Sequence, residues 1–138
     1  MDEEIKLYQS EDSELEPSNL TNREHYDIER LIFTIRNTQV ILDRDLAKLY
    51  NVETKVLNQA AKRNSARFPE GFRFQLTIEE CSRSQFVTLN TERGKNIKYL
   101  PYAYSEQGVA MLSAILKSQT AIDVSVKIMN AFVYMRSF

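Results

Sequence analysis

The sequence predicts an α+β domain: a helix-turn-helix unit with short antiparallel strands and a hairpin, closed by two C-terminal helices. Three observations predict this class. Two short segments with apolar residues at helical spacing meet at Asn51, a residue type that suits a tight turn between helices. Short runs rich in β-branched and aromatic residues stand on both sides of these segments. From Ser105 onward, capping residues followed by apolar residues at helical spacing occur twice.

The chain has 138 residues and 43% of them are apolar, enough for one core of ordinary size. The formal charge is −1 but unevenly distributed, because residues 1–24 carry a net −6 and the rest a net +5. Residues 1–24 also hold few large apolar side chains. We therefore expect an acidic flexible tail over residues 1–24 and a mildly basic domain over residues 25–138.

Composition also excludes several classes of protein. One cysteine, Cys81, and one histidine, His25, cannot form a disulfide or a zinc site within the chain. No apolar run approaches the length of about 18 residues that spans a bilayer, and the acidic N-terminus lacks the basic start of a secretory leader. We expect a cytoplasmic protein with no metal, cofactor, membrane contact or small-molecule substrate.

The first elements of the domain are two strands and two helices. Apolar residues at 28–35 and 40–42 flank the polar residues 36–39, which predicts two short strands around a turn. Asp43 is expected to N-cap a helix of about two turns that ends at Asn51. A second helix is expected from Thr54 to about Arg63, and its inner side consists of Leu57, Ala60 and Ala61.

A strand and a short helix follow. Residues 72–76 alternate apolar and polar side chains as in a half-buried strand, and Thr77 with Glu80 forms a capping box that starts a short helix. Two β-favouring runs, 85–90 and 96–102, flank residues 91–95 and predict a hairpin.

Two helices end the chain. Ser105 is expected to cap a helix through about Lys117, and Thr120 and Asp123 to cap the last one. The last helix carries apolar residues at helical spacing, namely Ile122, Val126, Met129 and Val133.

Residues 43–62 meet the steric requirements of a helix-turn-helix unit. Ala47 supplies the small side chain where two steeply packed helices touch, and Asn51 stands at the turn position that needs a positive φ. Five apolar side chains would lock the pair together: Leu46, Tyr50, Val52, Leu57 and Ala60.

The second helix of such a unit enters the major groove of DNA. We expect its outward residues to read base edges, namely Thr54, Lys55, Asn58 and Gln59. We expect phosphate contacts from basic residues beside it and on the predicted hairpin, namely Lys62, Arg63, Arg67, Arg93, Lys95 and Lys98. The alternative is that these side chains are an ordinary solvated surface and a charged hairpin tip.

Several strings match a known family in order. They are VILDRDLAKLYNV at 40–52, LN at 57–58, KRN at 62–64, RFP at 67–69, FQL at 74–76, SQ at 84–85, LPY at 100–102 and SEQGVAML at 105–112. From about Ile28 to Arg136 the chain resembles the ORF-six N-terminal domain of phage and bacterial antirepressor-like proteins, which is related to the KilA-N and Bro-N domains. The resemblance implies a DNA-binding module, usually the N-terminal part of a longer polypeptide and often phage-encoded.

The function expected from these features is sequence-specific binding of double-stranded DNA in prophage transcriptional control. The alternative is an antirepressor-type interaction module that sequesters a repressor through its C-terminal helices and does not bind DNA. No enzyme is expected: Glu79 and Glu80 are adjacent and diverge on a helix, and Cys81 is expected to be a small buried residue. Three tyrosines are expected to pack on the core instead of stacking on bases, namely Tyr99, Tyr102 and Tyr104.

The apolar residues of the last helix indicate a surface for a second copy of the chain. No glycine or proline ends its apolar pattern, and Phe132 and Phe138 are expected to add exposed apolar surface. One recognition helix usually gains affinity by pairing across two half-sites. We expect a homodimer through the C-terminal helix, and we expect the chain to be the N-terminal piece of a longer protein.

Overall fold

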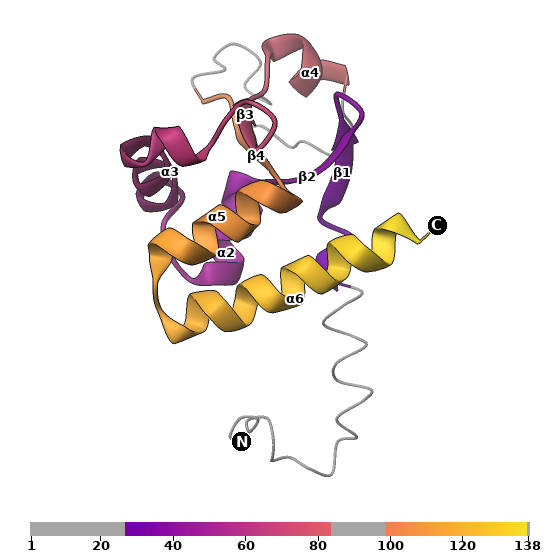
Figure 1. Ribbon diagram of the computed structural model, residues 1–138. Coiled ribbons are helices and arrows are strands. Elements are labelled where there is room, and N and C mark those ends of the chain that lie inside the picture. Colours follow the sequence, from indigo (N-terminus) through magenta and orange to yellow (C-terminus); the bar gives the residue numbers. More distant parts are fainter. Residues whose placement is uncertain (1–26, 84–98, 138) are drawn as a thin grey trace.

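The computed structural model describes residues 27–83 and 99–137, and the expected α+β class is confirmed (Figure 1). A four-stranded antiparallel sheet has the order β1-β2-β4-β3. The elements run β1 (Ile32–Ile35), β2 (Thr38–Leu42), α2 (Asp43–Tyr50), α3 (Thr54–Arg63), a 3-10 turn (Ser65–Arg67), β3 (Arg73–Gln75), α4 (Ile78–Arg83), β4 (Tyr102–Ser105), α5 (Glu106–Leu116) and α6 (Gln119–Arg136).

The sheet separates two apolar clusters because successive side chains of a strand point to opposite faces. Ile41 and Tyr104, which pair across β2 and β4, lie in the larger cluster with α2, α3, α5 and α6. Leu42, Ala103 and Phe74 lie in the smaller cluster with Cys81 of α4. Figure 1 shows the long helices below the sheet and α4 above it.

The strands β1 and β2 form the expected hairpin. Arg36 and Asn37 connect them, and both have positive φ, at 57° and 63°, as in the type I′ turns that suit two-residue hairpins. The first strand is shorter than predicted. Ile28 lies in a helical turn at residues 27–29, which a hydrogen bond from Leu31 N to Ile28 O (2.9 Å) closes.

The strand β4 lies between β2 and β3 although it is the last strand of the chain. The prediction that residues 96–102 form a strand is wrong for residues 99–101, which are irregular. Strand pairing begins at Tyr102 and continues to Ser105. Residues 102–104 pair with β3, and residues 103–105 pair with β2. The rest of the predicted hairpin, 84–98, lies outside the described residues.

The helix-turn-helix geometry follows the prediction closely. Asn51 adopts φ 63° and ψ 45°, and the N–H of Val52 donates to Ala47 O at 2.9 Å. Leu46, Ala47 and Leu57 are buried where α2 and α3 pack together. The expected N-cap is wrong, since Asp43 is the first residue of α2 and Leu42 occupies the cap position without a side-chain bond.

The C-terminal helices are present, with one cap misplaced. Ser105 caps α5 by accepting a hydrogen bond from Gly108 N at 3.3 Å. Ser118 caps α6 by accepting from Ala121 N at 3.0 Å, whereas Thr120 and Asp123, the expected caps, lie inside the helix. The expectation for Phe132 is also wrong, because its side chain is buried in the core.

Gly108 accounts for part of the SEQGVAML string. A Cβ at this position would lie 2.1 Å from the carbonyl oxygen of Phe72, which also accepts a hydrogen bond from Ser105 N at 3.0 Å. Only a glycine allows the first turn of α5 to approach this carbonyl so closely. The glycine therefore fixes how α5 docks beside β3.

Candidate nucleic-acid interface

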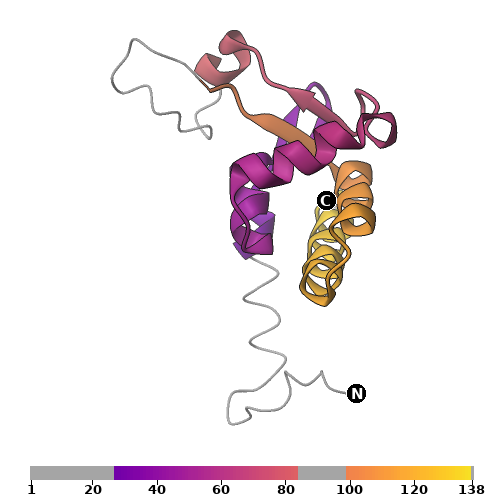
Figure 2. The same ribbon diagram turned by 90° about the vertical axis from the view of Figure 1, so that its left-hand side faces the viewer.

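The outward face of α3 is the most cationic helical surface of the helix-turn-helix unit. Figure 1 shows α3 at the left-hand edge of the molecule, and Figure 2 turns that side toward the viewer. Lys55, Gln59 and Lys62 follow one another at spacings of four and three, so they share a face, and Arg63 stands beside them. All four are exposed, and α3 contains no acidic residue.

The basic side chains of this face are not engaged elsewhere in the described part of the chain. Lys55, Lys62, Arg63 and Arg67 make no ion pair or side-chain hydrogen bond among residues 27–83 and 99–137. Arg67, in the 3-10 turn after α3, is exposed too and extends the cationic surface past the end of the helix. These side chains are therefore available to an external anion.

Two further residues of α3, Thr54 and Val56, differ from what the sequence predicted for the DNA-contacting face. Thr54, at the helix start, is half-buried, so it reaches solvent less than Lys55 does. Val56 is 47% exposed and was not among the expected contacts, because an apolar residue gives no charge or hydrogen-bonding signal in the sequence. Val56 therefore adds an exposed apolar side chain to the outward surface of α3.

Behind α3 lies a polar cluster around the buried Asp43, which we call the Asp43 network: Asp43, Asn58, Arg73, Tyr99, Tyr102 and Tyr104. The Asp43 carboxylate is 0% exposed. Its Oδ1 accepts from Arg44 N at 2.7 Å, and its Oδ2 accepts from Asn58 Nδ2 at 2.7 Å, from Tyr102 N at 3.1 Å and from the Tyr99 hydroxyl. These donors compensate the cost of burying a carboxylate.

Asn58 therefore differs from the other expected base-reading residues. Its Nδ2 donates to Asp43, and its Oδ1 accepts from the hydroxyl of Tyr104 at 2.8 Å and from Arg73 Nη2 at 3.5 Å. The side chain is half-buried, with both polar atoms used. Sequence reasoning placed Asn58 on the outer face from helical spacing alone. Its partners lie on distant strands, which that spacing does not reveal.

A family model for the ORF6N domain matches residues 30–115 of this chain. The chain belongs to the ORF6N domain family. This domain is found in phage antirepressor-like proteins. The matched residues include the β1–β2 hairpin, α2, α3 and the whole Asp43 network, so the cationic helix and its support are both parts of the ORF6N domain. No curated protein and no solved structure matched the chain.

Tyr99, Tyr102 and Tyr104 of the ORF6N domain are buried to different extents. Tyr104 is buried, and burial raises the pKa of its phenol, as it does for Tyr99. Arg73 donates to the Tyr104 hydroxyl at 2.9 Å and lies 3.9 Å from the ring centroid of Tyr102. The expected core packing is confirmed for Tyr104. Tyr102 is half-buried, and the ring of Tyr99 is exposed while its hydroxyl bonds to Asp43.

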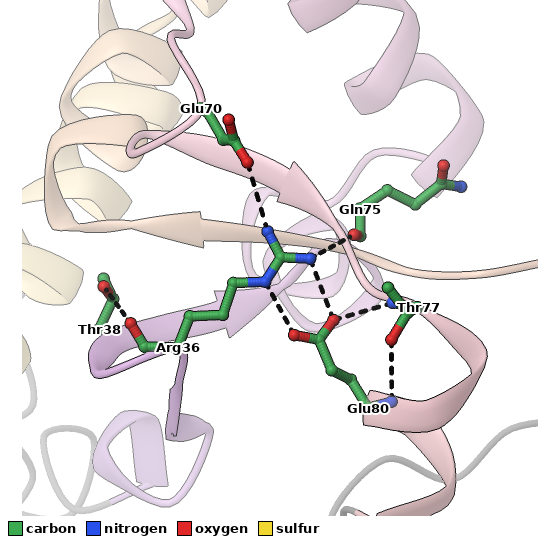
Figure 3. A network of polar contacts seen from close by, with 6 residues as sticks. All are labelled: Arg36, Thr38, Glu70, Gln75, Thr77 and Glu80. Atoms are coloured by element: carbon green, nitrogen blue, oxygen red, sulfur yellow. Dashed lines mark hydrogen bonds and ion pairs between the residues drawn. The ribbon is translucent and has the colours of Figure 1, made fainter.

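A second polar cluster lies on the α4 side of the sheet (Figure 3). We call it the Arg36 network: Arg36, Thr38, Glu70, Gln75, Thr77 and Glu80. Arg36 Nε donates to Glu80 Oε2 at 2.8 Å, and its guanidinium lies 4.2 Å from the ring centroid of Phe74. Glu80 also completes the expected capping box, since its Oε1 accepts from Thr77 N at 2.8 Å and its N–H donates to Thr77 Oγ1 at 3.0 Å. Hydrogen bonding to Arg36 lowers the pKa of Glu80.

The remaining expected residues divide between buried and undescribed positions. Cys81 is buried as expected, and burial raises the pKa of its thiol. Arg93, Lys95, Lys98 and His25 lie outside the described residues. Across residues 27–83 and 99–137, no cluster of three or more His, Cys, Asp or Glu side chains could hold a metal ion, and no helix has the length and hydropathy to cross a membrane.

Proposed function

We propose that this ORF6N domain binds double-stranded DNA sequence-specifically, with α3 in the major groove, in the transcriptional control of a phage or prophage. The observation that carries the proposal is the outward face of α3. Its basic side chains are exposed and have no partner among the described residues, while the opposite side of the helix is bonded to Asp43 and to β4. A rigidly supported helix with mobile long side chains suits base reading, because the support fixes its depth and angle in the groove.

Each residue has a distinct part in the proposal. Lys55 and Gln59, with Thr54 at the helix start, contact base edges, since an amide pairs with adenine and an ammonium with guanine. Val56 contacts thymine methyl groups. Lys62, Arg63 and Arg67 bind phosphates on one side of the groove. Asn58 acts as a positioning residue, because its amide is committed to Asp43 and Tyr104.

The test combines selection of bound sequences from a random duplex pool with binding isotherms at several salt concentrations. Gln59→Ala is expected to lower affinity for the selected sequence by about 1 to 3 kcal/mol and to leave random duplex binding nearly unchanged. Lys62→Ala is expected to weaken both kinds of binding and to reduce the salt slope by about one. Lys127→Gln, a charge loss on α6, is the matched control and should alter neither.

The second candidate is an antirepressor-type protein-protein module that does not bind DNA. The exposed apolar residues of α6 favour it, since such side chains often mark protein contacts. Counterion release gives DNA binding a steep salt dependence. A chain that shows no salt-dependent retention on any duplex, and whose Lys62→Ala variant behaves like the original, would overturn the DNA proposal in favour of this one.

A further inference from the structure

The outward side of α6 carries an apolar stripe, which we define as Ile122, Val126, Met129 and Val133. Ile122 is 44% exposed, Val126 55% and Val133 50%, and Met129 is half-buried at the edge. A different set of α6 residues faces the core of the domain, namely Ala121, Ser125, Ile128, Ala131 and Phe132. The helix is therefore apolar on two sides. One side is buried in the core of the described chain, and the stripe on the other touches the larger cluster at Met129.

The stripe has the spacing of a coiled-coil seam. Its members follow one another at intervals of four, three and four residues, an average near the 3.5-residue repeat of the a and d positions. The same intervals are read from either end of the helix. A helix with this property is complementary to a second copy that runs in the opposite direction, because each apolar residue then meets another apolar residue.

We propose that two copies of this chain pair through α6 in antiparallel orientation. The two-fold axis passes between Lys127 and Ile128, so Ile122 lies against Val133 of the second copy and Val126 against its Met129. All members of the stripe are paired in this register, and none faces a polar residue. A two-fold pair also needs only one surface, which both copies supply.

The residues along the open edge of the stripe suit this register. Asp123 and Asn130 stand on that edge, and both are exposed. In the antiparallel pair, Asp123 of one copy lies near Asn130 of the other, so a carboxylate meets an amide that can donate a hydrogen bond. The two Asp123 carboxylates are about nine residues, or about 13 Å, apart along the axis, beyond the Debye length of about 8 Å in physiological salt.

The pairing leaves the proposed DNA-binding face open. Within the described chain α6 packs against α5 and α2, whereas α3 packs against α2, α5 and the 3-10 turn. Figure 1 shows α6 along the lower side of the molecule and α3 at its left edge. A dimer would therefore carry two exposed recognition helices, the arrangement that reads two half-sites. The proposal itself rests on α6 alone and stands without DNA binding.

Sedimentation of the full chain over a wide concentration range, without DNA, tests the dimer. The expected result is a rise from the monomer mass toward twice that mass. Val126→Glu is expected to abolish the rise, because it buries a carboxylate in the seam. Thr120→Glu, an equal charge change at an exposed position on the opposite shoulder of α6, is the control and should still associate. Circular dichroism confirms that both variants are folded.

Disulfide cross-linking tests the direction of the pair. Ile122→Cys mixed with Val133→Cys is expected to give a mixed cross-linked dimer. Ile122→Cys alone is not, because residue 122 of one copy lies about 16 Å along the axis from residue 122 of the other, too far for a disulfide. A monomer at every concentration, or association that Val126→Glu leaves intact, would overturn the proposal. Cross-linking of Ile122→Cys with itself would overturn the antiparallel register. A failure to bind DNA would change neither the sedimentation result nor the cross-linking result.

Discussion

The Asp43 network and the Arg36 network use similar groups under opposite conditions of burial. Asp43 is fully buried and holds the start of α2 against α3 and β4 through hydrogen bonds to neutral donors. Arg36 and Glu80 form an ion pair at the surface that joins the β1–β2 turn to α4. The difference teaches that the presence of an ion pair does not indicate which network contributes more to the free energy of unfolding. We expect the unpaired but hydrogen-bonded carboxylate to contribute more than the ion pair does, because Asp43 itself is shielded from water whereas Arg36 is partly exposed.

The largest expected effect in this comparison is that of Asp43→Ala. It removes the acceptor of Asn58, Tyr99 and Tyr102 N at a fully buried position, so we expect a loss of about 3 to 5 kcal/mol in the free energy of unfolding. Urea unfolding at neutral pH measures it, with loss of the cooperative transition as the extreme outcome. Asp45→Ala, two residues along the same helix, should cost less than about 1 kcal/mol. Equal losses of stability for the two variants would contradict the larger contribution expected of the buried Asp43.

An intermediate effect is expected at a buried neutral pair. The hydroxyls of Tyr50 and Ser125 lie 2.6 Å apart and join α2 to α6, and burial raises the pKa of Tyr50 to about 12. Tyr50→Phe leaves Ser125 without this partner and should cost about 1 to 3 kcal/mol. Adding Ser125→Ala should restore much of the loss. A double variant as unstable as the sum of the single ones would show that the hydrogen bond contributes little.

A smaller effect is expected for Arg36→Ala. The side chain of Arg36 is one-third exposed, so solvent screens its ion pair with Glu80. We expect a loss of about 1 kcal/mol or less, part of it from the contact with the Phe74 ring. Unfolding in low and high salt separates the two parts, because only the ion pair weakens as salt rises. A loss above about 3 kcal/mol at high salt would reverse the ranking of the two networks.

The smallest effect is the pH dependence of that same pair. Because the pKa of Glu80 is lower in the folded state than in the unfolded chain, the carboxylate stabilises the fold above its unfolded pKa, about 4.3. This contribution is lost as pH falls through the folded pKa. The stability difference between the original chain and Arg36→Ala should therefore be constant near neutral pH and shrink below about pH 4. A difference that grows on acidification would contradict the assignment.

Local features of the fold could be predicted from the sequence, whereas long-range partners could not. The left-handed Asn51, the Thr77–Glu80 capping box and the Ser105 cap each depend on residues within four positions of one another. Asp43 looked like an N-cap for the same local reason. Its actual partners at 99 and 102 are brought to it by β4, and no local pattern indicates them.

The two surfaces proposed for binding show the same limit. Helical spacing identified Lys55, Gln59 and Lys62 as one face, but it could not show that Asn58 turns inward to the strands. In α6 two overlapping apolar patterns share one helix, and only the packing of α2 and α5 decides which of them is buried. The prediction for Phe132 failed for this reason.

The order of strands in the sheet has a consequence for synthesis on the ribosome. The chain is made from its N-terminus, so β1, β2, α2, α3 and β3 emerge before β4, which in the finished sheet lies between β2 and β3. Until β4 has been made, the edges of β2 and β3 that it covers in the finished sheet lack that partner, and unpaired edges can recruit strands from other chains. This strand order therefore leaves two strand edges uncovered in the nascent chain that β4 covers in the finished domain.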